Sequence, residues 1–128
     1  MNYYHSRIIN KSFEDALSAV IEALAKEGFG TLSQINLSEK LKEKLGVNLN
    51  RYMILGACNP SLAYKALQVE DKIGVMLPCN VIIQEKESGQ IEVAAINPLA
   101  SMAAVGNANL DSIASEVSRK LKSALDAL

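Results

Sequence analysis

Residues 78–98 read PCNVIIQEKESGQIEVAAINP, and this stretch decides the fold class. Two runs in which apolar and polar residues alternate flank the turn dipeptide Ser88-Gly89, which is the pattern of a β-hairpin. The two strands of a hairpin must pair antiparallel. The sequence therefore predicts an antiparallel or mixed sheet rather than the parallel sheet of a doubly wound protein.

Strands and amphipathic helices alternate over the rest of the chain, because the spacing of apolar residues changes from two to three or four. Strands are predicted over residues 3–9, 29–37 and 51–58, helices over residues 12–28, 38–46, 60–69 and 109–128, and a loop of small residues over 98–108. This order, β-α-β-α-β-α-β-β-α, favours an α+β domain with about five strands in one sheet. The long helices would pack mainly on one of its faces, and the short helices, a partner subunit or a ligand would cover the other.

Composition limits the classes of protein to which the chain can belong. With 128 residues, 49% of them hydrophobic, the chain is expected to form a single domain, residues 1–128. Thirteen basic against 14 acidic residues give a formal net charge of −1, without the basic excess typical of nucleic-acid binders. We therefore expect neither nucleic acid nor a membrane as a partner.

The N-terminal residues, MNYYHSRIINKSFED, lack the basic and apolar segments of a signal peptide. No apolar run is long enough to cross a membrane. These features predict a cytoplasmic protein, in which Cys58 and Cys79 are reduced thiols.

Both cysteines lie in similar surroundings, in LGACNP (55–60) and LPCNV (77–81). Asn59 and Pro60 are typical of a helix start, which places Cys58 beside the positive end of a helix dipole, where a thiolate is stabilised. If the strands that carry Cys58 and Cys79 are antiparallel neighbours, both thiols lie at the same edge of the sheet. The alternative is that both cysteines are small apolar residues of the core.

No motif for a nucleotide, a phosphate loop or a serine nucleophile is present, and no cofactor is predicted. Two cysteines 21 positions apart are not a metal signature, since zinc sites bring Cys or His residues in close pairs. A soft-metal site would need further ligands, for which His5, the single histidine, is the candidate. No metal site is therefore predicted, with Cys58, Cys79 and His5 as the residues to check.

Four segments together resemble the family catalogued as domain of unknown function 302. They are GFGTLSQINL (28–37), KEKLGVNLNRYMILGACNPSLAYKAL (42–67), IGVMLPCNVII (73–83) and INP (96–98). The resemblance runs from about Tyr3 to Leu125. It implies a curved antiparallel sheet in a β-α-β(4)-α core like that of the TATA-binding protein, with two short inserted helices, and frequent dimers. It implies no activity.

The chain departs from its resemblance to that family at three positions. Similar members commonly carry acids where this chain has Gln34, Asn36 and Asn97. Amides cannot ionise, so acid–base or metal chemistry that used those carboxylates would be impaired here. Alternation places Gln34 and Asn36 on one strand face, where they would line one wall of a pocket.

The leading hypothesis is a small-molecule or anion binding domain that forms a homodimer, in which a second subunit helps to cover the free face of the sheet. Its expected ligand-binding residues are Cys58, Asn59, Pro60, Cys79, Asn80, Gln34 and Asn36. A thiol-dependent enzyme or redox protein with Cys58 as nucleophile and Cys79 as second thiol is one alternative. A purely structural or assembly module is the other, and the sequence leaves open whether the protein is an enzyme.

Overall fold

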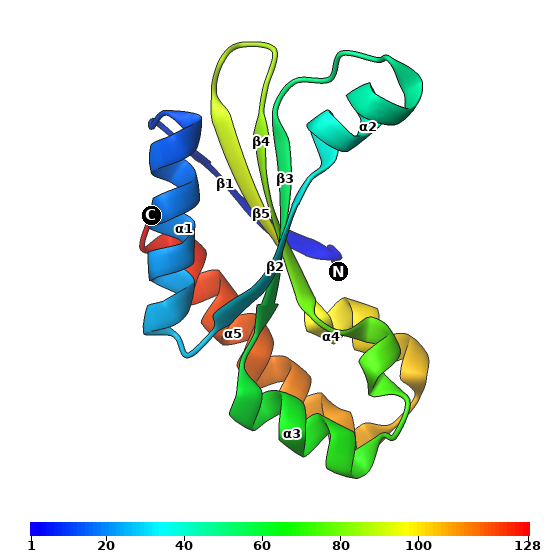
Figure 1. Ribbon diagram of the computed structural model, residues 1–128. Helices are drawn as coiled ribbons and strands as arrows, with labels where there is room; N and C mark the ends of the chain where they lie inside the picture. Colours follow the sequence, from blue (N-terminus) through cyan, green and yellow to red (C-terminus); the bar gives the residue numbers. More distant parts are fainter.

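The structure, a computed structural model, describes residues 1–128 and contains five strands and five α-helices (Figure 1). The strands are β1 (Tyr4–Ile9), β2 (Gly30–Asn36), β3 (Tyr52–Cys58), β4 (Cys79–Glu85) and β5 (Ile91–Ile96). The helices are α1 (Phe13–Lys26), α2 (Leu37–Leu45), α3 (Pro60–Val69), α4 (Pro98–Ser101) and α5 (Asp111–Asp126). Three short 3₁₀ turns, η1 (Ile73–Met76), η2 (Met102–Val105) and η3 (Ala108–Leu110), complete the chain.

The five strands form one sheet in the order β1-β5-β4-β3-β2, and every neighbouring pair is antiparallel. The hairpin predicted around Ser88-Gly89 joins β4 and β5, with Val81 opposite Ala95. The α+β class and the antiparallel sheet with helices mainly on one face are thereby confirmed. The strands twist strongly along their length in Figure 1.

Helices α1 and α5 lie on the same side of the sheet (Figure 1) and cover it with their apolar stripes. Alternation along each strand sends every second side chain toward these helices. The central residues of this core, each exposed by no more than 1%, are Val20, Leu24, Leu55, Val81, Ile83, Val93 and Leu121. A smaller cluster joins α3, α5 and the three 3₁₀ turns and consists of Ala66, Ile73, Met102, Leu110 and Ala114.

Local capping explains where most helices begin and end. The backbone N–H of Asp15 donates to the Ser12 hydroxyl at the start of α1, and Gly28 takes a positive φ of 88° after the helix. Ser38 begins the helix predicted over 38–46 and is of a residue type that commonly caps helices, but it does not cap α2. Asn36 is the cap, because its Oδ1 accepts from the backbone N–H of Glu39, while the Ser38 hydroxyl donates to that same oxygen.

The segment 98–108, predicted as a loop, instead folds into α4 and two 3₁₀ turns. Asn97 caps α4, since its Oδ1 accepts from the backbone N–H of Leu99, and Pro98 occupies the first helical turn. Met102 and Leu110 are buried here and build the smaller cluster. Turns this short carry too few apolar positions to show a helical period in the sequence.

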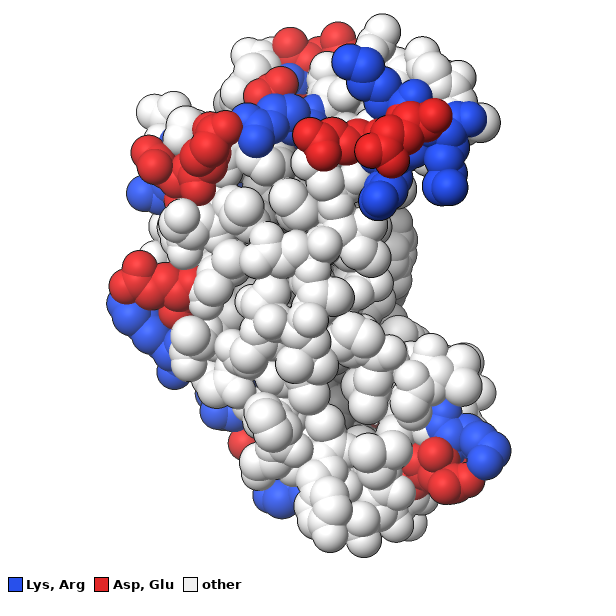
Figure 2. Space-filling view, viewed as in Figure 1, with Lys and Arg blue, Asp and Glu red and all other residues white.

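The opposite face of the sheet carries no long helix. Figure 1 shows it as a concave side, bounded by α2 above and by α3 and α4 below. In the same view, Figure 2 shows charged side chains around α2, down the left side and in a smaller group at the lower right, whereas the middle carries none. None of the helices combines the length and the apolar character needed to cross a lipid bilayer.

Candidate functional site

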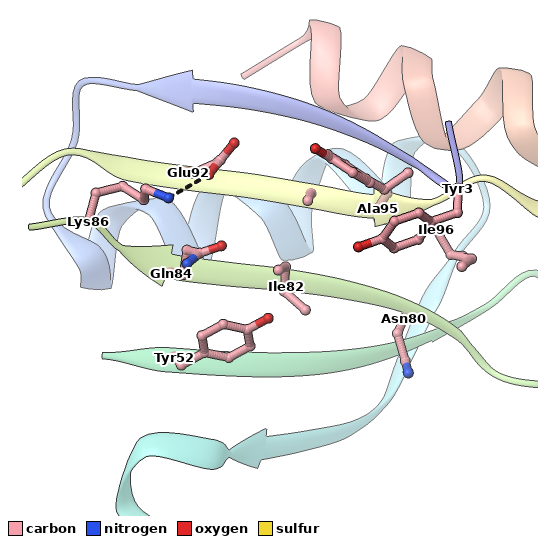
Figure 3. A pocket seen from close by; sticks show the side chains of 11 residues that line it. Tyr3, Tyr52, Asn80, Ile82, Gln84, Lys86, Glu92, Ala95 and Ile96 are labelled. Carbon is pink, nitrogen blue, oxygen red and sulfur yellow. Dashed lines mark ion pairs between the residues drawn. The ribbon is translucent and has the colours of Figure 1, made fainter. Parts of the chain in front are cut away.

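A pocket of about 440 Å³ lies on the uncovered face of the sheet, which we call the open face (Figure 3). Its floor is built from residues of β4 and β5 that alternate away from the core, with Ile82 half-buried and Ala94 nearly buried. Figure 3 shows Ile82 between Tyr52 of β3 and Tyr3, which precedes β1. The volume falls in the range of small-molecule sites.

Aromatic rings and uncharged polar groups line this pocket. The Tyr3 and Tyr4 rings meet edge to face, with their centroids 4.9 Å apart. Side-chain amides are contributed by Asn80 and Gln84. Neither amide makes one of the chain's side-chain hydrogen bonds, so both have donors and acceptors free for a ligand.

The two charges at the rim of the open-face pocket neutralise each other. The Lys86 ammonium lies 3.4 Å from the Glu92 carboxylate, and these side chains are 43% and 22% exposed. A partly exposed pair of this kind contributes little to stability. For recognition its effect is that the pocket has no unpaired charge with which to attract an anion or a cation.

The two thiols come together at the opposite end of β3 and β4. Ala57 is the register partner of Cys79, so Cys58, the next residue, ends β3 beside the start of β4. This confirms the expected neighbouring antiparallel strands. Both cysteines are free; Cys58 is half-buried and Cys79 is buried.

Burial, and after it the nearby Cys58 thiolate charge, raises the pKa of the Cys79 thiol to about 11. Cys79 is therefore a neutral thiol at physiological pH. Both residues line an apolar cavity of about 20 Å³, which has room for a single water-sized particle and not for a metabolite. That this end of the sheet binds an organic ligand stays a prediction, and the cavity shared by the two cysteines is too small to support it.

The other residues predicted for that site have structural partners. Asn59 caps α3, since its Oδ1 accepts from the backbone N–H of Leu62, and its amide also donates to the carbonyl oxygen of Glu27 at 3.3 Å. Pro60 is the first residue of α3, as expected. Asn80 lines the open-face pocket and also a second open pocket of about 290 Å³, which Cys79 lines as well.

Gln34 and Asn36 share a face of β2, as alternation predicts, because their register partners are Leu55 and Met53. These partners precede Cys58 by three and five residues, so the two amides lie roughly 10 and 16 Å along the strand from the thiols. Neither residue lines the cavity between the cysteines. That they form a wall of the cysteine site stays a prediction, which this separation does not favour.

His5 is engaged far from the cysteines. Its Nε2 lies 3.0 Å from the Ser118 hydroxyl, which donates in turn to Oδ1 of Asn97 at 2.9 Å. An amide oxygen only accepts, so Ser118 must accept the proton of His5 Nε2–H. The amide nitrogen of Asn97 donates to the carbonyl oxygen of Asn2. These hydrogen bonds connect β1 with α4 and α5. Because Nε2 of His5 carries the proton in this arrangement, it cannot act as a base toward Ser118.

Comparison with known proteins agrees with this geometry. A sequence model of the family described as "Domain of unknown function DUF302" matches residues 5–128. The chain belongs to this family. The crystal structure of an uncharacterized conserved DUF302 protein from Bacillus stearothermophilus is similar over 98% of both chains, with a TM-score of 0.92 and 26% identity. An uncharacterized protein of Aquifex aeolicus (strain VF5) is 29% identical over 94 residues, which are 73% of this chain and 59% of that protein.

The amides at positions 34, 36 and 97, where similar DUF302 proteins commonly carry acids, do not lie together in one site. Asn97 follows β5, whereas Gln34 and Asn36 lie on the edge strand β2, with β3 and β4 in between. Two of the three amides cap helices. The residues that sequence reasoning missed are the tyrosines of the open face and Met102, a residue 23 positions beyond Cys79 that lines the same cavity.

Proposed function

We propose that this DUF302 domain is a small-molecule binding domain, and that its site is the open-face pocket. The observation that carries the proposal is the combination of lining groups around 440 Å³ of space: three tyrosines, two unengaged amides and an apolar floor. Ring stacking would come from Tyr3 and Tyr52, and directional hydrogen bonds from Asn80 and Gln84. This combination suits an uncharged, planar nitrogen heterocycle, since amide side chains pair with the edge of such a ring.

Charge separates this proposal from an anion site. The ion pair of Lys86 with Glu92 cancels the charge at the rim, and the middle of the molecule in Figure 2 carries no charged side chain. A negative group on the ligand would therefore gain little from the protein. Adenosine and adenosine monophosphate form a suitable pair of probes, because they differ only in the phosphate.

Titration calorimetry with adenosine tests the proposal. We expect saturable binding that is not strengthened by the phosphate of adenosine monophosphate. Tyr52→Ala should weaken it roughly tenfold, because stacking of a base on an aromatic side chain contributes about 1–3 kcal/mol. Tyr64→Ala is the matched control, since Tyr64 is 66% exposed on α3 and outside the pocket. No binding, or equal loss in both variants, would contradict the proposal.

We also propose that the open face takes part in forming a homodimer. Two isoleucines on the edge strands favour this, since Ile8 on β1 is 52% exposed and Ile35 on β2 is 44% exposed on that face. Large exposed apolar side chains on both edges are typical of an interface. Sedimentation velocity should show a dimer that Ile8→Glu converts to monomer, and a wild-type monomer at high concentration would refute it.

A reducing compartment such as the cytoplasm suits this domain, because its two adjacent cysteines are both free thiols. The thiol chemistry considered from the sequence uses Cys58 as nucleophile and Cys79 as second thiol, but Cys79 is buried and its raised pKa keeps it protonated, which makes it a poor partner in thiol exchange. Binding, rather than thiol catalysis, is therefore the function that we propose.

A further inference from the structure

Four of the chain's six sulfur-containing residues line two neighbouring spaces at one end of the fold. Cys58, Cys79 and Met102 line the cavity of about 20 Å³ described above. Cys79 and Met102 also line a neighbouring open pocket of about 290 Å³, to which Met76 contributes. The remaining two sulfurs belong to Met1 and Met53, which line neither space.

The small cavity exists because two hydrophobic clusters meet there without closing completely. Cys79, Leu62 and Val117 belong to the main core, whereas Ala66 and Met102 belong to the smaller cluster. Of the 12 lining residues, 11 are hydrophobic, so a water molecule would find few of the polar partners that it needs. An ion of about that size that prefers sulfur to oxygen ligands would be bound better in this cavity than water.

We propose that Cys58, Cys79 and Met102 bind one copper(I) ion. Thiolate and thioether sulfurs are soft ligands that select copper(I). A structural zinc site would require four ligands, commonly including closely spaced Cys or His pairs, and the cavity offers three sulfurs only. The chain's one histidine is bonded to Ser118 and is not among the lining residues.

Binding of copper(I) is an exchange of protons for metal, without oxidation. Each cysteine that becomes a ligand releases its S–H proton to solvent and donates an electron pair to copper, whereas Met102 donates a pair without losing a proton. Helix α3 begins at Pro60, two residues after Cys58, and has ten residues. The positive end of its dipole therefore lies beside the negative charge of a Cys58 thiolate.

The open pocket offers copper a route from solvent to this site. Leu77, Cys79 and Met102 line both spaces and so form the wall between them. Val75 is 85% exposed and Met76 is 37% exposed at the outer pocket. A copper ion would therefore meet the Met76 thioether before it reaches the two buried ligands, Cys79 and Met102.

Competition with the chromogenic chelator bicinchoninate, under anaerobic and reducing conditions, tests the proposal with copper(I) alone. The reduced wild-type protein should withdraw one equivalent of copper(I) from the chelator. Cys58→Ser should weaken binding by at least about 100-fold and Met102→Leu by roughly tenfold, since loss of even an outer-shell partner of a metal costs about 10–100-fold in affinity. X-ray absorption of the copper complex should show only sulfur neighbours.

Met53→Leu is the matched control, because Met53 lies on β3 and lines neither space. It should bind copper(I) as the wild type does. Both methionine variants keep an apolar side chain of similar volume, and melting curves verify that they fold. The proposal is overturned if the wild type takes no copper, if Cys58→Ser binds it unchanged, or if both leucine variants weaken binding equally.

Discussion

The stability of the domain should fall above pH 8 because of one buried thiol. Burial, and then the charge of Cys58, raises the pKa of Cys79 to about 11 from an ordinary value of 9.0. Between these two values the unfolded chain has lost the thiol proton while the native state still holds it. The unfolded state then binds fewer protons, so the free energy of unfolding decreases as pH rises.

The size of this loss follows from the two pKa values. One pKa unit corresponds to about 1.4 kcal/mol, so Cys79 should remove about 1 kcal/mol between pH 8 and pH 10. The full difference of two units, roughly 3 kcal/mol, is reached only above pH 11. Against a typical total of 5–15 kcal/mol for a domain, as an order-of-magnitude range, even the first figure is measurable.

Urea unfolding of the metal-free, reduced protein at pH 8 and pH 10 measures this effect. Tyrosines and lysines also titrate near pH 10, so the quantity that matters is the difference between the wild type and Cys79→Ala. The variant should lose about 1 kcal/mol less than the wild type over that interval. Cys58→Ala should keep most of the loss, because burial is the larger cause of the shift. Equal losses in the wild type and Cys79→Ala would refute the reasoning.

Three substitutions test the local structure by urea or thermal unfolding. Asn97→Asp should cost about 1–3 kcal/mol at pH 7, because it replaces the amide donor to the Asn2 carbonyl with an acceptor; an unchanged midpoint would contradict this. Gly56→Ala should cost about 1–3 kcal/mol, since the new Cβ would lie 2.7 Å from Cγ of Pro78, and a stabilised variant would refute it. Asn59→Ala should cost about 1–2 kcal/mol through loss of the α3 cap, whereas a loss below about 0.3 kcal/mol would show that the cap is unimportant.

Alternation and capping made most of the fold predictable. The hairpin at 78–98 required antiparallel pairing, and the Asn59-Pro60 helix start came from residue types that act within one turn. The meeting of Cys58 with Cys79 was predictable for the same reason, because it needs only two neighbouring antiparallel strands. Alternation along a strand and capping of a helix involve residues close in sequence, so both can be recognised without the tertiary structure.

The candidate sites were less predictable because they depend on contacts between distant segments. Met102 reaches the cysteines only because the segment after β5 folds back as short turns beneath α3. Tyr3 and Tyr52 line one pocket from either side of β5 and β4, and the sequence alone did not give this order of strands. Asn36 and Asn97 resembled lost acids of a catalytic site, and their role as helix caps depends on backbone geometry.

Chemical-shift mapping of the ¹⁵N-labelled protein during titration with adenosine tests the central claim most directly. Binding at the open face predicts shifts for the backbone amides around Tyr3, Tyr52, Asn80 and Gln84, and for Ala94 on the pocket floor. The amides of α1, on the covered side, should not move. Shifts concentrated at Cys58 and Asn59, or none at saturating adenosine, would contradict the claim that the open face is the binding surface.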